Sequence, residues 1–303
     1  MARILVGAAD GLHVFEDGRE GGLEHAGRGV TALARDGEEL WAILDRREVR
    51  RTVDGRWSPG FVSSSDASMT CLAATRAGTL VGLSEARLVR VGETTGLETV
   101  AGFGSVEGRD GWSTPWGGPP DTRSIAEDED AVYVNVHVGG IPRSRDGGTT
   151  WEPTIDVDAD VHRVWAGEVG VLAAGAHGLS VSRNGGDTWE LRSDGLHARY
   201  CRAVALCSDT VMLSASTGPR SGRAALYRGS LRGGPFEKCT TGLPEWFGAN
   251  IDSAWLDASS ELAAFGTEDG RVFASTDEGA SWAEVASRLP PISCVIVVGS
   301  RPA

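Results

Sequence analysis

The chain repeats one stretch, first seen as Ser144-Arg145-Asp146-Gly147-Gly148-Thr149-Thr150-Trp151, at two later positions. The second copy runs from Ser182 to Trp189 and the third from Ser275 to Trp282. Each copy keeps a Ser, an Asp or Asn two positions later, a Gly at the fifth position and a final Trp. In such a turn the Asp or Asn side chain accepts backbone hydrogen bonds, and Gly supplies a positive φ. The three copies predict short strands joined by tight turns, with each Trp anchoring its turn.

A second repeat of seven short segments sets the predicted number of sheets. The segments start about 39 to 53 residues apart, near the ~40–45 expected for a four-stranded propeller blade. They are residues 31–34, 70–73, 123–126, 162–165, 202–205, 252–255 and 293–296. The last segment has no strands after it, whereas the N-terminus carries strand-like runs at 4–7 and 12–15. We therefore predict one domain over 1–303, a seven-bladed β-propeller whose last blade is closed by the N- and C-terminal strands. Six or eight blades remain alternatives.

The repeated turn resembles the Asp-box, or BNR repeat, of sialidases, sortilin-type propellers and related bacterial proteins. The resemblance implies that each box links the third and fourth strands of a blade, on the face away from any binding site. It does not imply a sialidase, because the early Phe-Arg-Ile-Pro motif and a convincing third arginine are absent, and Ile141-Pro142-Arg143 lies in the wrong part of its blade. The family also includes glycosidases, assembly factors and peptide-binding receptors, so fold alone does not select a function.

Bulk properties restrict the classes of partner. The net charge of −13 opposes nonspecific binding to nucleic acid or to an anionic membrane. No run approaches the ~20 apolar residues of a membrane span. Five cysteines without C-x-x-C spacing fit reduced, packed thiols better than disulfides or a zinc-thiolate site. The sequence therefore predicts a cytoplasmic protein that binds neither nucleic acid nor membrane.

The first position of each of the seven segments is polar and differs in kind from blade to blade. Such positions are expected to surround the mouth of the central channel. Four of them, two arginines, a histidine and an aspartate, predict a site there. The seven residues are Thr31, Thr70, Arg123, His162, Arg202, Asp252 and Ser293. The neighbouring loops add Asp121, Asp160, His137, His177 and His197.

Three interpretations of these residues stay open. In the first, His162 is a general base assisted by Asp252, while Arg123 and Arg202 bind an anionic group. In the second, two of His137, His162 and His177 hold a divalent metal together with Asp160 or Asp252. In the third, the histidines are ordinary loop residues. Paired carboxylates among Asp121, Asp160 and Asp252 would also suit a glycosidase.

An insertion at 101–121 is predicted to form the wall or lid of this site, with Trp112, Trp116 and His177 contacting the ligand. The leading hypothesis is a small-molecule-binding propeller, with hydrolysis or elimination of an anionic or carbonyl-bearing compound as its reaction. The sequence does not decide whether a reaction takes place. The alternative is a noncatalytic scaffold that binds a protein partner through an exposed Trp246-Phe247 loop.

Overall fold

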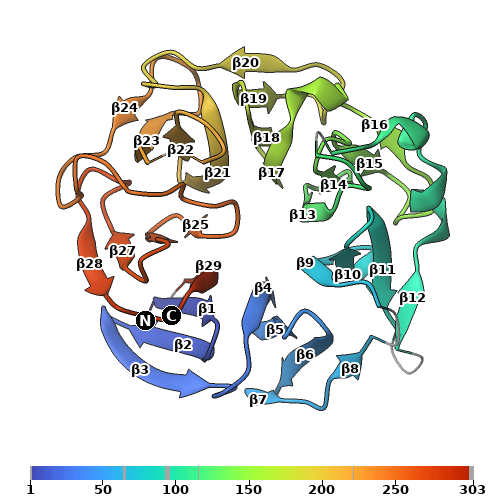
Figure 1. The fold of residues 1–303 in the computed structure, drawn as a ribbon, viewed down its shortest axis with the longest axis horizontal. Coiled ribbons are helices and arrows are strands. Elements are labelled where there is room, and N and C mark those ends of the chain that lie inside the picture. Colours follow the sequence, from blue (N-terminus) through green and yellow to red (C-terminus); the bar gives the residue numbers. More distant parts are fainter. Residues whose placement is uncertain (1, 64–65, 93–95, 115, 221, 300–303) are drawn as a thin grey trace. The chain divides into compact units, whose positions relative to one another are not determined.

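The chain is a seven-bladed β-propeller, here described from a computed structural model that covers residues 2–63, 66–92, 96–114, 116–220 and 222–299. Pro115, within the predicted insertion, lies outside the described residues. Six sheets have four antiparallel strands, and one has a fifth strand that pairs with its third (Figure 1). The predicted closure is confirmed, because β1 (Arg3–Ala8) pairs with β29 (Ile292–Val298) in one sheet.

The chain divides into two compact units, and the single domain stays a prediction. One unit comprises residues 31–173 and 180–191. Its first blade contains β4 (Val30–Asp36), β5 (Glu39–Leu44), β6 (Glu48–Val53), β7 (Arg56–Trp57) and β8 (Phe61–Val62). The second contains β9 (Met69–Thr75), β10 (Gly78–Leu83), β11 (Arg87–Val91) and β12 (Leu97–Thr99), followed by the 3-10 helices η1 (Ala101–Ser105) and η2 (Arg109–Gly111). The third contains β13 (Thr122–Glu127), β14 (Val132–Val136), β15 (Pro142–Ser144) and β16 (Glu152–Pro153), followed by η3 (Val157–Ala159).

The boundary between the units runs through the fourth blade. That blade contains β17 (Val161–Gly167), β18 (Gly170–Gly175), β19 (Gly178–Ser182) and β20 (Glu190–Arg192). The other unit holds the fifth blade, with β21 (Tyr200–Cys207), β22 (Thr210–Ser216), β23 (Ala224–Ser230) and β24 (Glu237–Lys238). The sixth contains β25 (Leu256–Ala258), β26 (Ala263–Gly266), β27 (Val272–Ser275) and β28 (Ala283–Ala286), and the terminal blade adds β2 (Gly11–Glu16) and β3 (Arg19–Glu24) to β29 and β1.

The first copy of the repeated turn joins β15 to β16, the third and fourth strands of its blade. The Ser144 hydroxyl accepts the Gly148 N–H at 2.8 Å and donates to Asp146 Oδ1 at 2.9 Å. The same carboxylate oxygen accepts the Thr150 N–H at 2.8 Å. The Trp151 indole N–H donates to the Gly148 carbonyl at 3.1 Å. The turn thus satisfies its own backbone, as its sequence predicts.

The other two copies are not equivalent to each other. Trp282 donates to the carbonyl of Gly279 in its own turn at 3.2 Å, as in the first copy. Trp189 instead donates to the carbonyl of Thr154 at 2.9 Å, outside its turn and 35 residues away. Since all three turns share one sequence pattern, this difference arises from the surroundings of each indole.

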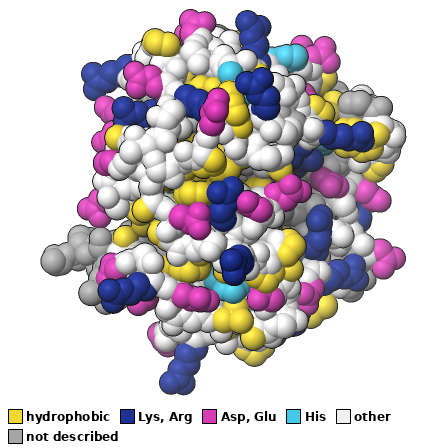
Figure 2. All heavy atoms as spheres, turned by 60° about the vertical axis from the view of Figure 1, so that its left-hand side comes forward, with side chains coloured by type: hydrophobic (Ala, Val, Ile, Leu, Met, Phe, Trp, Pro, Cys, Tyr) yellow, Lys and Arg dark blue, Asp and Glu magenta, His cyan; other side chains and the backbone are white. Residues whose placement is uncertain are grey.

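Apolar side chains of adjacent blades pack into shared cores. Val132, Val134 and Val136 on one face of β14 pack with residues of the second blade, while Tyr133 on the other face packs with β17. This alternation follows from the two-residue period of a strand. On the face drawn in Figure 2, acidic and basic side chains are interspersed. Among the described residues, no helix has the length and apolar character needed to cross a membrane.

The first strands of four blades contain a β-bulge at or beside the first position of the predicted segments. The strand register skips Thr70, Arg123 and Ser293, because it shifts by one residue at each of them. In β21, Arg202 and its neighbour together stand opposite a single residue of β22. A bulge turns a side chain away from the regular alternation of the strand. These positions are therefore structurally distinct, as well as polar.

The sixth predicted segment, residues 252–255, is wrong as a strand. The chain turns there, and β25 begins only at Leu256. Asp252 Oδ1 accepts the N–H of Ser253 at 2.8 Å, and the Asp252 carbonyl accepts the N–H of Trp255 at 3.0 Å. Asp is well suited to such a turn because its side chain competes with strand hydrogen bonding.

Candidate metal and ligand site

Two histidines and an aspartate come together between the third and fourth blades. His137 Nε2 lies 3.4 Å from Asp160 Oδ1, and His162 Nε2 lies 3.7 Å from Asp160 Oδ2. One ligand atom from each of the three residues falls within 4.8 Å of the other two. The imidazole centroids are 6.0 Å apart. His162 is fully buried and His137 nearly so, whereas the Asp160 side chain is 30% exposed, so the cluster opens to solvent at its carboxylate.

His137 is positioned by a tight turn that follows β14. Its N–H donates to the carbonyl of Asp121 at 3.0 Å. The next residue, Val138, has a φ of 54°, a left-handed conformation that is strained for a β-branched residue. A Cβ on Gly140 would lie 2.7 Å from the Ile155 carbonyl oxygen, so only glycine fits there. The turn therefore keeps a strained backbone and fixes the direction of the His137 side chain.

Asp160 and His162 are positioned by the entry into β17. Asp160 caps the C-terminus of the short helix η3; its φ is 43°, and its N–H donates to the Val157 carbonyl at 3.2 Å. His162 follows as the second residue of β17, and β13 packs beside that strand. Both segments of the cluster thus contain a left-handed non-glycine residue.

The electrostatics of the cluster favour an ionised carboxylate. The nearby imidazole of His137 lowers the pKa of Asp160 below its ordinary value, and the charges of His162 and Arg123 act in the same direction, against the effect of burial. The two imidazole contacts are longer than good hydrogen bonds, and Asp160 Oδ1 is buried without a well-formed one among the described residues. Buried carboxylate oxygens normally accept a hydrogen bond or bind an ion, so Asp160 Oδ1 is able to accept a further ligand.

Asn135 is a further polar residue that sequence reasoning missed. It lies two residues before His137 on β14, is fully buried, and neither amide atom has a hydrogen-bond partner within the described chain. The available signal was one polar residue in the otherwise apolar run Val132–Val136. Buried amides normally satisfy their donors and acceptors, so Asn135 marks this part of the blade as built for more than packing.

The donor set fits a transition metal. Zinc–nitrogen and zinc–oxygen bonds of about 2.0–2.2 Å place neighbouring donors about 3.0–3.5 Å apart. The separations of 3.4 and 3.7 Å are close to this range, so small side-chain rotations would complete the set. Two imidazoles and one carboxylate suit zinc, iron, nickel or copper, whereas magnesium and calcium prefer oxygen donors alone.

The insertion contributes two tryptophans in different ways. The Trp116 indole is 72% exposed and its ring centroid lies 5.2 Å from that of His137. Trp112 is buried and lies against the turn that carries His137, because a Cβ on Gly139 would approach its ring to 3.0 Å. Trp116 is therefore available to a ligand, while Trp112 packs against the turn that carries His137.

The remaining predicted site residues belong to the other unit. Arg202 Nη1 pairs with Asp252 Oδ1 at 3.0 Å, and the Arg202 guanidinium lies 5.6 Å from the centre of the Tyr200 ring. Asp252 therefore forms an ion pair within that unit. His177 is exposed in the turn between β18 and β19. The roles of these three residues in catalysis or binding stay predictions.

The predicted exposed Trp246-Phe247 loop is wrong for Phe247. That residue is buried, forms a β-bridge with Ala224, and packs edge-on against Phe265 at 5.5 Å. Trp246 is half-buried, with Lys238 Nζ 3.4 Å from the centre of its ring. The loop thus directs one aromatic side chain into the core and covers the other with a cation.

No protein-family model matches the chain, and no curated protein matches it either. The solved structures that it resembles are propellers of low sequence identity. The computationally designed protein Ika8 is 15% identical with a TM-score of 0.61, and the match covers 95% of this chain and 85% of that one. YCF48 bound to a D1 peptide is 16% identical with a TM-score of 0.56, covering 97% and 88%. The GH74 enzyme of Niastella koreensis is 12% identical with a TM-score of 0.63, covering 92% of this chain and 51% of that one. At these identities the likeness identifies the fold alone: this chain is a β-propeller.

Proposed function

We propose that this propeller binds a divalent transition metal through His137, Asp160 and His162, and that a small anionic or carbonyl-bearing molecule binds at that metal. The observation that carries the proposal is the convergence of three donor atoms within 4.8 Å. The donors come from two separate segments, the turn after β14 and the entry into β17. Each of the two segments contains a non-glycine residue with positive φ, Val138 and Asp160.

Metal binding accounts for the burial of His162 better than general-base catalysis does. A general base must come within hydrogen-bond reach of the proton that it removes. His162 is fully buried, so it does not present an imidazole to solvent. A metal ligand needs no such exposure, because the open coordination positions face the substrate. A bound metal would polarise a carbonyl group or lower the pKa of a water molecule, chemistry suited to hydrolysis or elimination.

Two neighbouring residues indicate the class of ligand. Arg123 lies on a β-bulge and is close enough to Asp160 to lower the pKa of that carboxyl, so its positive charge reaches the cluster. Trp116 presents an exposed indole beside His137. A cation and an aromatic surface next to a metal favour an anionic ligand with a planar or apolar part.

Metal analysis tests the first half of the proposal. Protein stripped with a chelator is titrated with Zn²⁺ by calorimetry, and we expect one equivalent to bind and to raise the melting temperature. Asp160→Asn, which keeps the shape of the side chain, should abolish this binding. His13→Asn is the matched control, since His13 also contacts a carboxylate, Asp10, at 2.9 Å, but in the terminal blade. Zinc binding that survives in Asp160→Asn, or is lost in His13→Asn, contradicts the assignment.

A ligand screen tests the second half. Small carboxylates, phosphates and acidic sugars are added to the zinc-loaded protein, and the change in melting temperature is measured. We expect a compound class that stabilises the wild type more than Arg123→Gln, while both proteins retain their zinc. If no member of the panel distinguishes the two proteins, Arg123 has no part in binding.

A further inference from the structure

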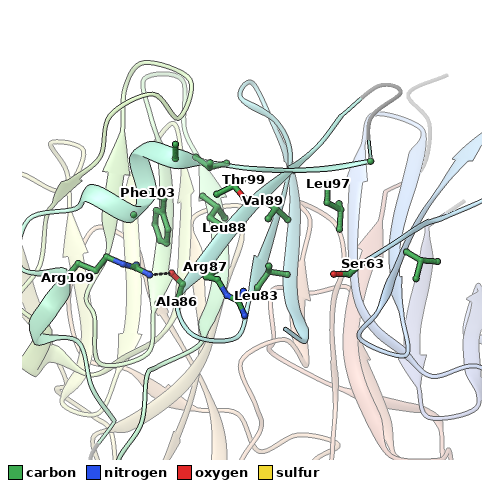
Figure 3. A pocket seen from close by; sticks show the side chains of 15 residues that line it. Ser63, Leu83, Ala86, Arg87, Leu88, Val89, Leu97, Thr99, Phe103 and Arg109 are labelled. Atoms are coloured by element: carbon green, nitrogen blue, oxygen red, sulfur yellow. Dashed lines mark hydrogen bonds between the residues drawn. The ribbon is translucent and has the colours of Figure 1, made fainter. Parts of the chain in front are cut away.

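A second cavity lies between the first and second blades, away from the metal cluster. Its volume is about 400 Å³, and none of His137, Asp160 and His162 lines it. One side is formed by the end of β8 and the residue after it, Ser63. The remaining lining residues come from the end of β10 and the turn after it, from β11 and β12, and from the start of the insertion. Figure 3 shows Phe103 and Arg109 at one side of the pocket, and Leu97 and Ser63 at the other. Cavities of about 300–1,000 Å³ are the usual size for small-molecule sites.

The wall of the cavity combines apolar side chains with polar groups. Leu83, Leu88, Val89 and Phe103 line it, and each of these residues is buried. Phe103 is held in place by an edge-on contact with Trp151, with ring centroids 5.2 Å apart. Apolar side chains supported by the blade core are suited to a short alkyl chain or a ring.

Among the described residues, the charged side chains that line the cavity are both basic, Arg87 and Arg109. The protein as a whole carries a net charge of −13. Arg87 pairs with Glu85 at 3.0 Å and is partly exposed. In a protein so rich in acidic residues, a pocket whose described charged side chains are both basic favours an anion.

The Arg109 guanidinium packs against two aromatic rings of the insertion, Phe103 and Trp112. Its Nη2 donates to the Ala86 carbonyl at 2.7 Å, and the group lies 5.7 Å from the centre of the Phe103 ring and 4.9 Å from that of Trp112. Its Nη1 is buried and has no hydrogen-bond acceptor among the described residues. A guanidinium fixed in this way places a positive charge at the wall of the cavity, and that charge favours a carboxylate there.

We propose that this cavity binds a small organic carboxylate with an apolar body. The carboxylate meets Arg109, and the apolar part lies along Leu83, Val89 and Phe103. The pocket shares no residue with the proposed metal site, so the inference does not depend on the proposed function. The ligand class is defined by one negative charge and a body of roughly eight to twelve non-hydrogen atoms, consistent with the volume.

Three probes of matched length test the proposal by calorimetry on the full chain: octanoate, octanol and octylamine. We expect octanoate to bind at least about tenfold more tightly than octanol, and octylamine to bind most weakly. Arg109→Gln should reduce the affinity for octanoate to that for octanol, and should leave octanol binding unchanged. Equal binding of octanoate and octanol, or unchanged octanoate binding in Arg109→Gln, overturns the proposal, as does an absence of octanoate binding.

Thr99→Trp provides a second variant that keeps both arginines. Thr99 is an exposed residue of β12 that lines the cavity, so a larger side chain fills the opening without disturbing the core. Octanoate binding should be lost while zinc binding at the other site and the melting temperature are retained. Octanoate binding that persists in this variant places the ligand elsewhere and refutes the assignment.

Discussion

Replacing the tryptophan of each repeated turn by alanine should produce unequal losses of stability. Trp151 is 8% exposed and contacts Phe103, and Trp282 is 5% exposed and contacts Phe265 at 5.0 Å. Trp189 is only half-buried. The three turns share one sequence pattern, so equal roles of the tryptophans would predict equal losses in the free energy of unfolding. The burial of the three indoles instead predicts a smaller loss for Trp189→Ala.

The size of the effect follows from the buried area. A tryptophan side chain buries up to about 250 Å², so Trp151 at 8% exposure buries roughly 230 Å². At about 25 cal/mol per Å² this corresponds to roughly 6 kcal/mol as an upper bound. The remaining alanine methyl and a compact denatured state reduce it to about 3–5 kcal/mol, the usual range for Trp→Ala in a core. Trp282→Ala falls in the same range, and Trp189→Ala should cost at least about 1 kcal/mol less.

The assay is urea unfolding followed by far-ultraviolet circular dichroism, with the free energy extrapolated to zero denaturant. Trp116→Ala is the matched control, because its indole is 72% exposed and its loss should leave the free energy of unfolding almost unchanged. If Trp189→Ala proves as costly as Trp151→Ala, burial is not what distinguishes the turns. A large loss in Trp116→Ala would contradict the exposure of that residue.

Three further predictions follow from local geometry. The hydroxyl and N–H of Thr150 lower the pKa of Asp146 from 3.8 to about 2, so its stabilising effect is complete above pH 3.8 and is lost as the pH falls towards 2. In Asp146→Asn the melting temperature should therefore fall less steeply than in the wild type as the pH is lowered from 3.8 to 2. An equally steep fall in both proteins would contradict this prediction. Gly242→Ala should lower the melting temperature far more than Gly234→Ala, since both have positive φ but only Gly242 has a backbone oxygen 1.8 Å from the added Cβ; equal effects would contradict this. Burial should keep the native thiols unreactive towards a disulfide reagent until urea unfolds the chain, and a thiol that reacts in the native state would refute it; they are Cys71, Cys201, Cys207, Cys239 and Cys294.

The amino-acid sequence by itself determined the architecture. The repeated turns and the seven segments predict seven blades, and the missing strands of the last blade predict its closure by both termini. These features are readable because they are local and periodic: a turn satisfies its own backbone, and a strand alternates every two residues. The exception was residues 252–255, which were predicted as a strand because of their apolar neighbours. Asp252 forms a turn there instead.

Only the tertiary structure decided how the candidate site is composed. The sequence offered several histidines and two carboxylates as partners, and the fold placed His137 and His162 around Asp160 while pairing Asp252 with Arg202. It also buried Phe247 and opened a cavity beside Arg109. Such outcomes depend on contacts between residues far apart in the chain and on single left-handed residues such as Val138. No periodic pattern encodes them, because each results from the packing of one blade against the next.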